Sequence, residues 1–397
     1  MIIIVKDDSF MDIADIPNHY EREPKKIVVE SQQDLLEAKK LKNIVGIYLR
    51  GMDEVEEIDL SEFKEIEEIA IHYNFRLKRI NGLKNLSNLK NISYPAYEQD
   101  KMYNLLLKNI LDQINLTKLL SQPFAQLLLS VFSIPLLKTK YPNFFEDFSD
   151  YSSKIYFCDV TDTFLKGEIF SSCTFEEAKQ VELIIDKWIQ ENIEPTICNV
   201  EKFARIYEYV LNIDYDISHD ESDEKHNIAC TMAKTLLRGK GICVGYAQLL
   251  KYISLKCGLQ CEYIQACLRG NYDTKYNETN NLMSICPKQK DKSKLNEFII
   301  PNHAIVCFSP DNVNWLFADP TNDSFFNRKA MEENKTLKSW GAFCLTQDEM
   351  ELYNVPYMYD YNGNEIKLNS QLTPVIAAQL NDAINGIFNK NTRGKHY

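Results

Sequence analysis

The chain has 397 residues, of which 45% are hydrophobic, 26% are charged and 11% are aromatic. This much apolar and aromatic surface excludes a mainly disordered chain and is enough for two or three domains with cores of their own. Asp and Glu number 57 against 45 Lys and Arg, which gives a net charge of −12. We therefore expect neither nucleic acid nor an anionic membrane surface as a partner.

The first residues do not form a pattern typical of an export signal. Only Ile2 to Val5 are apolar before Lys6, which is too short for the apolar region of a signal peptide. The chain has 11 cysteines, an odd number without a Cys-x-x-Cys pair, and this usage is typical of a reducing compartment. We expect a cytoplasmic protein, with export by a route that needs no cleaved signal as the alternative.

A short hydrophobic pattern repeats near the N-terminus. The spacing that starts at Ile44 (apolar, two residues, apolar, one residue, apolar) recurs eleven residues later at Val55 and again at Ile66, and a fourth copy starts at Leu89. Alternation over the last three positions of each copy predicts a short strand, and the first apolar residue is suited to a turn packed beneath it.

One part of this region, Ile80 to Ile92, resembles a leucine-rich repeat unit, although the Asn that usually follows the strand is missing. The resemblance implies a leucine-rich-repeat-like region over residues 1–98 that binds a protein partner or caps the fold. The alternative is a small domain of helices and strands whose apolar spacing coincides with that of the repeat.

Residues 99–197 are predicted to form a helical region. The apolar segment 124–137 is expected to be a buried helix that ends near Pro135, and it is shorter than the roughly 20 residues that span a bilayer. Thr174 and Glu177 have the spacing of a capping box, which predicts the start of another helix.

The pattern that indicates chemistry begins at Cys243. Gly239 and Gly241 predict a tight loop that ends at this cysteine, and a helix is predicted from there to about Cys257. Free N–H groups and the dipole at a helix N-terminus favour the thiolate, which is the nucleophilic form of cysteine. Cys243 is therefore the candidate nucleophile, whereas other cysteines such as Cys261 are expected to be buried packing groups.

Two predicted strands supply the groups that would activate this thiol. One strand has His303 near its start, and the next, after a turn at 309–312, ends at Asp319. Because antiparallel neighbours place these ends side by side, Asp319 is expected to accept the imidazole N–H while the other ring nitrogen faces Cys243. Such a Cys-His-Asp set is a thiol-hydrolase arrangement. Tyr215 is a candidate donor to the oxyanion, beside the backbone N–H of Cys243.

Three blocks of sequence together resemble the transglutaminase-like superfamily: Gly239-Lys240-Gly241-Ile242-Cys243-Val244-Gly245-Tyr246-Ala247, Asn302-His303-Ala304 and Phe317-Ala318-Asp319-Pro320-Thr321. The resemblance covers about residues 203–323 and implies a papain-like core with Cys243 as nucleophile, His303 as base and Asp319 as orienting group. The superfamily includes peptidases, protein cross-linking acyltransferases, deamidases, glycan-removing amidases and members that have lost catalysis.

The chain departs from the bacterial pattern of this superfamily at Ile305 and Leu316, where Trp and Tyr are common. Residues 270–297 predict a long loop, which is either a lid over the site or a disordered insertion. These features leave the substrate class open. The spacing of Cys and His residues is unlike that of a zinc site, and His219 and His226 are expected to be solvated, so we expect neither a metal nor a cofactor.

The sequence as a whole predicts an α+β protein. Its expected parts are a leucine-rich-repeat-like region (1–98), a helical region (99–197), a papain-like transglutaminase-like catalytic domain (198–388) and a polar tail (389–397). The expected activity is on amide bonds of protein or peptide substrates through a cysteine thioester, with hydrolysis by a peptidase or deamidase favoured over amine transfer. The alternative is a catalytically inactive protein that serves as a protein-interaction module.

Overall fold

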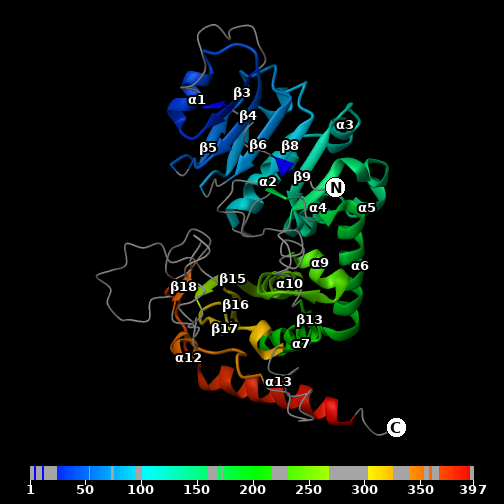
Figure 1. Ribbon diagram of the computed structural model, residues 1–397, viewed down its shortest axis with the longest axis vertical. Coiled ribbons are helices and arrows are strands. Elements are labelled where there is room, and N and C mark those ends of the chain that lie inside the picture. The colour runs from blue at the N-terminus through cyan, green and yellow to red at the C-terminus, as the bar shows by residue number, and fades with distance from the viewer. Residues whose placement is uncertain are drawn as a thin grey trace, which may run out of the picture. The chain divides into compact units, whose positions relative to one another are not determined.

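The computed structural model describes residues 4–5, 11–12, 25–52, 54–72, 76–94, 101–158, 169–170, 173–216, 231–267, 303–324, 340–352, 357–359 and 366–393. The chain divides into an N-terminal unit, residues 1–180, and a C-terminal unit, residues 181–397. The division falls within helix α6 (Phe175–Asn192) (Figure 1). The mixture of helices and strands confirms the α+β class, and the finer domain boundaries expected from the sequence stay predictions.

The N-terminal unit is built on an eight-stranded sheet in the order β12-β10-β9-β8-β6-β4-β3-β2. In chain order its strands are β2 (Met11–Asp12), β3 (Lys25–Val29), β4 (Ile44–Arg50), β6 (Glu68–His72), β8 (Asn91–Tyr94), β9 (Gln126–Ser130), β10 (Ile155–Cys158) and β12 (Cys173–Thr174). All neighbours pair in parallel except β10 and β12. Helix α1 (Gln32–Ala38) connects β3 to β4.

Two shorter sheets lie in the same unit as the eight-stranded sheet. In one, β5 (Glu57–Asp59) and β7 (Arg79–Asn81) pair in parallel, and in the other, β1 (Ile4–Val5) pairs antiparallel with β11 (Ile169–Phe170).

The hydrophobic repeat supplies strands alternately to two parallel sheets. The copies that start at Ile44, Ile66 and Leu89 contribute β4, β6 and β8 of the large sheet, whereas the copy at Val55 contributes β5 of the small one. The central residues of the first set are register partners and are at most 3% exposed: Ile47, Ile69 and Ile92. The eleven-residue spacing is therefore half of the structural unit, which contributes one strand to each sheet.

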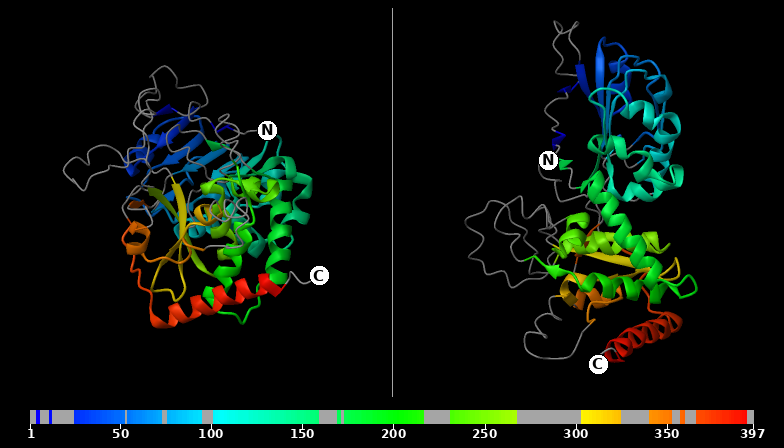
Figure 2. Two further views of the ribbon diagram at one scale, coloured as in Figure 1. Left: turned by 60° about the horizontal axis from the view of Figure 1, so that its bottom comes forward. Right: turned by 90° about the vertical axis from the view of Figure 1, so that its right-hand side faces the viewer.

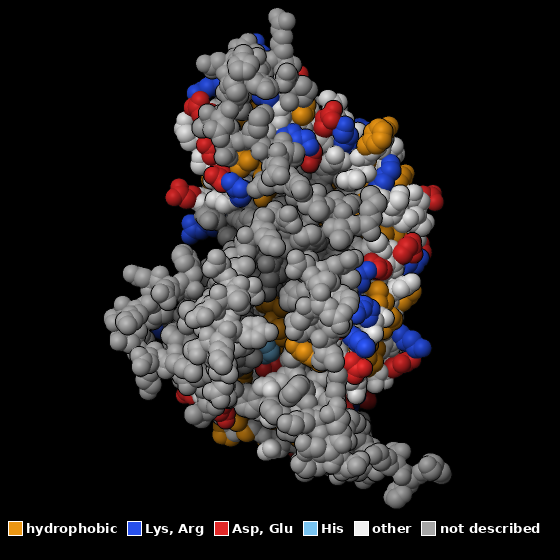
Figure 3. All heavy atoms as spheres, viewed as in Figure 1, with side chains coloured by type: hydrophobic (Ala, Val, Ile, Leu, Met, Phe, Trp, Pro, Cys, Tyr) orange, Lys and Arg blue, Asp and Glu red, His pale blue; other side chains and the backbone are white. Residues whose placement is uncertain are grey.

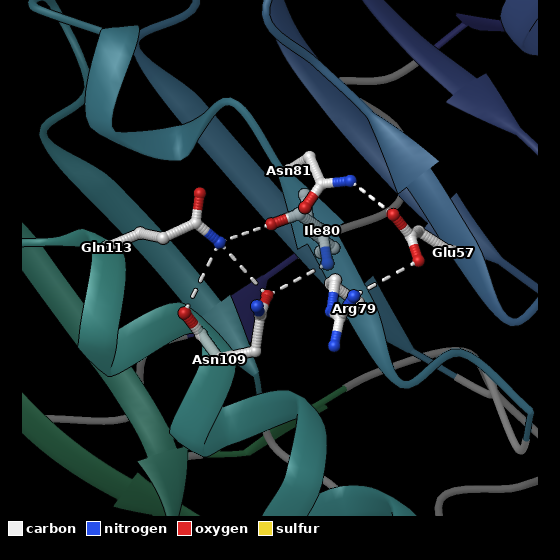
Figure 4. Close-up of polar contacts among 6 residues, drawn as sticks. All are labelled: Glu57, Arg79, Ile80, Asn81, Asn109 and Gln113. Carbon is white, nitrogen blue, oxygen red and sulfur yellow. Dashed lines mark hydrogen bonds and ion pairs between the residues drawn. The ribbon is translucent and has the colours of Figure 1, made fainter.

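Helix α2 (Lys101–Gln113) covers the outer edge of the small sheet (Figure 4). The N–H of Ile80 in β7 donates to Asn109 Oδ1 at 2.9 Å, and Gln113 Nε2 donates to the carbonyl of Ile80 at 2.5 Å. On the other side of β7, Glu57 of β5 accepts from Arg79 and Asn81. The two amide side chains make the bonds that a further parallel strand would make, so the small sheet ends at β7.

The region 99–197 contains strands as well as helices, which corrects the helical prediction. The segment 124–137 is not one helix, because β9 ends at Ser130 and helix α4 (Ile134–Lys140) begins afterwards with Pro135 in its first turn. Proline lacks an N–H and is suited to the first turn of a helix rather than to its end. The other short helices of this region are α3 (Leu116–Leu120) and α5 (Phe144–Asp147).

The predicted start of α6 is confirmed. The N–H of Glu177 donates to Thr174 Oγ1 at 3.2 Å, and the N–H of Thr174 donates to Glu177 Oε2 at 2.9 Å, as in a capping box.

The C-terminal unit contains a four-stranded antiparallel sheet in the order β17-β16-β15-β18 and a parallel pair, β13-β14. The strands are β13 (Asp214–Tyr215), β14 (Lys240–Gly241), β15 (Gln260–Cys267), β16 (His303–Ser309), β17 (Leu316–Ala318) and β18 (Tyr357–Tyr359). The helices after α6 are α7 (Asn199–Leu211), α9 (Met232–Arg238), α10 (Cys243–Lys256), α12 (Gln347–Leu352) and α13 (Pro374–Arg393).

Helix α10 lies at the centre of this unit. It contacts β15 and β16 of the sheet as well as α7 and α9, while α13 packs against α7 (Figure 2). Residues 244–254 of α10 are all buried. Because the helix is enclosed along most of its length, the residue at its start has a fixed position relative to the sheet.

Charged side chains of opposite sign are interspersed among the described residues of the face in Figure 3. Ion pairs at the surface of the described residues include Lys39 with Glu62 and Lys78 with Glu56. Over the part of the chain that the structure describes, every helix is too short or too polar to cross a membrane.

Candidate active site

Cys243 is the first residue of α10 and is half-buried. Ile242 precedes it in an extended conformation, with φ −117° and ψ −174°. The N–H groups in the first turn of a helix have no partner within the helix, and the helix dipole adds partial positive charge there. The sequence prediction that Cys243 starts a helix is thus confirmed.

Two glycines shape the connection that leads to Cys243. Gly239 ends α9 with φ 64°, in the left-handed region that favours glycine. At Gly241 a side chain is excluded by a steric clash, because a Cβ there would lie 2.3 Å from Oγ1 of Thr235. Thr235 is fully buried and has little room to move. A side chain at Gly241 would displace the connection and the start of α10 with it.

The strand pair β13-β14 fixes the same connection from its other side. Tyr215 is the register partner of Gly241, and the N–H of Asp216 donates to the Gly241 carbonyl at 2.9 Å. The Asp216 carboxylate is buried and accepts from Arg238 at 2.9 Å. Tyr215, the predicted oxyanion donor, is thus placed beside the loop that precedes Cys243, and its side chain is half-buried. Its role stays a prediction.

His303 and Asp319 lie at the same end of two neighbouring antiparallel strands, β16 and β17. The Nε2 atom of His303 lies 2.7 Å from Oδ2 of Asp319. The carboxylate is fully buried and the imidazole side chain is 6% exposed. The second oxygen of Asp319 accepts from the N–H of Asn322 at 3.1 Å. Each carboxylate oxygen of Asp319 therefore has a hydrogen-bond partner. The fixed carboxylate in turn fixes the orientation of the imidazole ring.

The pKa of His303 is raised well above its ordinary value. Burial acts to lower it, but the charge and hydrogen bond of Asp319, followed by the hydrogen bond and charge of Cys243, outweigh burial. Because Nε2 faces Asp319, Nδ1 is the ring nitrogen that remains for Cys243. A protonated imidazole next to a thiol favours an imidazolium–thiolate pair.

The structure thus brings Cys243, His303 and Asp319 together, and their roles in catalysis stay predictions. Other cysteines have a different environment. Cys261 in β15 is fully buried, and burial is the main cause that raises its pKa to about 12. Burial also raises the pKa of Cys257, at the end of α10, to about 11. These thiols are protonated at neutral pH, in agreement with the packing role expected for them.

Sequence reasoning missed a second carboxylate beside the site. Asp323 follows Asp319 by four residues, at the end of the helical turn 320–324, and is 1% exposed. It accepts from the Tyr207 hydroxyl at 2.7 Å and from the N–H of Ala342 at 3.0 Å. The sequence signal for this carboxylate is its spacing of four residues from Asp319, because this spacing places two side chains on one face of a helical turn.

The described residues contain no group of three or more His, Cys, Asp and Glu side chains that could hold a metal ion. His219, His226 and the predicted loop 270–297 lie outside the described residues.

A search of curated proteins finds none that matches the chain. The family model of the transglutaminase-like superfamily matches residues 187–320. This range contains the central helix α10 and the three residues Cys243, His303 and Asp319. The C-terminal unit therefore carries a transglutaminase-like domain.

Proposed function

We propose that this protein is a thiol enzyme that acts on amide bonds of protein or peptide substrates through a cysteine thioester. The observation that carries the proposal is the 2.7 Å contact between His303 Nε2 and Asp319 Oδ2, with Cys243 at a helix N-terminus on the other side of the imidazole. In this proposal Cys243 is the nucleophile, His303 the proton carrier and Asp319 the orienting carboxylate, which are the three groups that acyl transfer requires.

In the first half of the reaction the Cys243 thiolate attacks the carbonyl carbon of the amide. The carbonyl oxygen becomes an oxyanion, which the backbone N–H of Cys243 stabilises, with Tyr215 as the proposed second donor. The imidazolium of His303 then gives its Nδ1 proton to the amide nitrogen, and the carbon–nitrogen bond breaks. An amine or ammonia leaves, and a thioester remains on Cys243.

In the second half water attacks the thioester carbonyl and gives a proton to His303. The carbon–sulfur bond breaks, a carboxylic acid leaves and the imidazolium–thiolate pair is restored. Asp319 holds the imidazole ring in both halves. We favour hydrolysis over amine transfer because water is always present at such a site. A backbone amide substrate makes the enzyme a peptidase, and a side-chain amide makes it a deamidase.

For residues 1–98, within the N-terminal unit, we propose a leucine-rich-repeat-like region that binds a protein partner. The support is the parallel stacking of β4, β6 and β8 from successive copies of one hydrophobic pattern, together with the second parallel pair β5-β7.

Alkylation by iodoacetamide at about pH 6, measured for each cysteine by mass spectrometry, tests the proposal for the C-terminal unit. An ordinary thiol with a pKa of about 8.5 reacts slowly at this pH because little of it is thiolate. We expect fast labelling of Cys243 in the wild type and its loss in His303→Ala. Cys198 is free and exposed, so it serves as the internal reference for an ordinary accessible thiol.

If Cys243 in the wild type reacts no faster than Cys198, the enzyme proposal is wrong and the inactive interaction module is favoured. If Cys243 reacts fast, a peptide substrate in the presence of hydroxylamine adds a second check. Hydroxylamine intercepts a thioester as a hydroxamate, and this product should be absent with Cys243→Ala.

A further inference from the structure

Asp319 is held by more than its contact with His303. Its backbone N–H donates to the Ala342 carbonyl at 2.9 Å, and its carbonyl accepts from the N–H of Asp323 at 3.3 Å. The carboxylate of Asp323 accepts in turn from the N–H of Ala342, at 3.0 Å to Oδ1 and 3.2 Å to Oδ2. These bonds close a ring of three residues. Asp319 cannot shift relative to Ala342 without breaking a bond of this ring.

The carboxylate of Asp323 also ties the ring to helix α7. The hydroxyl of Tyr207 donates to Asp323 Oδ2 at 2.7 Å, and Tyr207 is fully buried. Its aromatic ring packs 4.7 Å from that of Phe343 and 5.5 Å from that of Trp340, between centroids. Because α7 also contacts α10, one hydrogen bond connects the segment that carries Asp319 to the helices around Cys243.

We propose that Asp323 is a positioning residue of this site, which keeps the Asp319 carboxylate in line with His303 and whose charge adds to the negative field behind the imidazole. This inference rests on the proposed function because it assigns a role within the same site. Asp323 acts through Asp319 and does not itself contact the thiol or a substrate in this scheme.

The charge of Asp323 changes near neutral pH. Its pKa is raised to about 7, mainly by burial and further by the charge of Asp319, although the hydrogen bonds from Tyr207 and Ala342 act to lower it. The titratable groups around it are Tyr207 from α7 and Asp319 with His303 behind it, while Cys344 acts on Tyr207. Above about pH 7 the ionised Asp323 stabilises the imidazolium of His303, and below that pH this contribution is lost.

The test is the rate of Cys243 alkylation by iodoacetamide across pH 5 to 9, in the wild type and three variants. We expect an inflection near pH 7 in the wild type. Asp323→Asn keeps the shape and a hydrogen-bonding group but cannot ionise, so its rate should match the wild type at pH 6 and its profile should lack the inflection. Tyr207→Phe removes a donor that lowers the pKa of Asp323, so the inflection should move to higher pH.

Asp323→Ala breaks the ring, and we expect it to slow the reaction of Cys243 at pH 6 by on the order of ten-fold, since misplaced reacting groups lose rate steeply. Rescue of that rate by Asp323→Asn separates positioning from charge. The matched control is Asp311→Asn. Asp311 holds the turn between β16 and β17 through bonds to Val313 and Asn314, away from the ring, and its variant should keep the wild-type profile.

The outcomes distinguish this inference from the proposed function. Slow Cys243 in the wild type contradicts the proposed function. Fast Cys243 in the wild type, with an Asp323→Asn profile that superimposes on it and an unchanged rate in Asp323→Ala, overturns the inference alone. If Asp323→Ala does not fold, the profiles of Asp323→Asn and Tyr207→Phe decide, and an unchanged inflection in both overturns it.

Discussion

The two units of this protein differ in where their carboxylates lie, at the surface or in the interior. In the N-terminal unit many of the described carboxylates pair with lysine or arginine at the surface, as Glu62 does with Lys39, and none of the described ones is buried. Among the described residues of the C-terminal unit, four carboxylates are at most 3% exposed: Glu182, Asp216, Asp319 and Asp323. A buried charge is costly unless it has hydrogen-bond partners, and each of these has at least one.

This difference agrees with the proposed location of the active site in the C-terminal unit. Surface ion pairs contribute little and are replaceable, so the N-terminal unit depends on its apolar strands. Two of the buried carboxylates, Asp319 and Asp323, surround the candidate site, and a third, Asp216, holds the loop before Cys243. Glu182 accepts from Tyr252 and Lys256 near the other end of α10. Buried polar groups therefore hold both ends of the helix that carries the thiol.

The largest expected effect is on the pH dependence of stability. The folded-state pKa of Asp323 is about 7, above the ordinary carboxyl value of 3.8, so the stability it contributes is present below about pH 4 and is lost as pH rises to about 7. The linkage relation converts this shift to about 4 kcal/mol. Urea unfolding of the C-terminal unit at several pH values should show this loss, and Asp323→Asn should remove that part of the slope. Equal slopes in both proteins would contradict it.

The next effect concerns the orienting carboxylate. Asp319→Asn removes the charge that keeps the pKa of His303 raised, so Cys243 should react as an ordinary thiol at about pH 6, slower by roughly two orders of magnitude. The matched control from the N-terminal unit is Glu62→Gln, which breaks a surface pair and should leave the rate of Cys243 unchanged. Equal rates for Asp319→Asn and the wild type would mean that the buried carboxylate of Asp319 matters no more to Cys243 than the surface carboxylate of Glu62 does.

A third effect tests the packing around the loop that precedes Cys243. Gly241→Ala forces a Cβ against Thr235 and should lower the free energy of unfolding of the C-terminal unit by about 2 kcal/mol. Denaturant titration measures this loss, and Thr235→Ala in the same chain should recover part of it. Gly239→Ala is a useful companion, because it meets no neighbour and acts only through its positive φ. Additive losses for Gly241→Ala and Thr235→Ala would exclude the contact as the cause.

The smallest effect belongs to the N-terminal unit. Asn109→Ala leaves the buried N–H of Ile80 without its acceptor and should lower the free energy of unfolding of that unit by roughly 1 kcal/mol. Cys243 should react at the wild-type rate in this variant. Arg79→Ala, which removes an exposed partner of Glu57 on the same strand, is the matched control and should change stability by less than about 0.5 kcal/mol. Equal losses in the two variants would mean that the edge bond is not what stabilises the small sheet.

The sequence could predict that Cys243, His303 and Asp319 come together, because local patterns mark the elements on which they lie. Glycines mark the loop before Cys243, and alternating apolar residues mark the strands that carry His303 and Asp319. Asp323 could not be predicted in the same way, because its partner Tyr207 lies 116 residues away in the sequence and its burial depends on how α7 packs.

Two features of the N-terminal unit show the same limit. The eleven-residue spacing is visible in the sequence, but strands of both parallel sheets have the same apolar pattern, so the sequence does not show that copies alternate between sheets. The segment 124–137 is apolar almost throughout, and a buried parallel strand followed by a helix has the same composition as a single buried helix.

The amide side chains of Asn109 and Gln113 in α2 affect how the small sheet can be extended and whether another chain can bind to its edge. An open strand edge is a template on which a second chain can add a strand. At Ile80, Asn109 and Gln113 occupy both backbone groups, so that position of β7 is closed to addition. A duplicated repeat placed before β7 would leave this closure intact. A further strand added to the small sheet beyond β7 would need its own pair of amides to close the new edge.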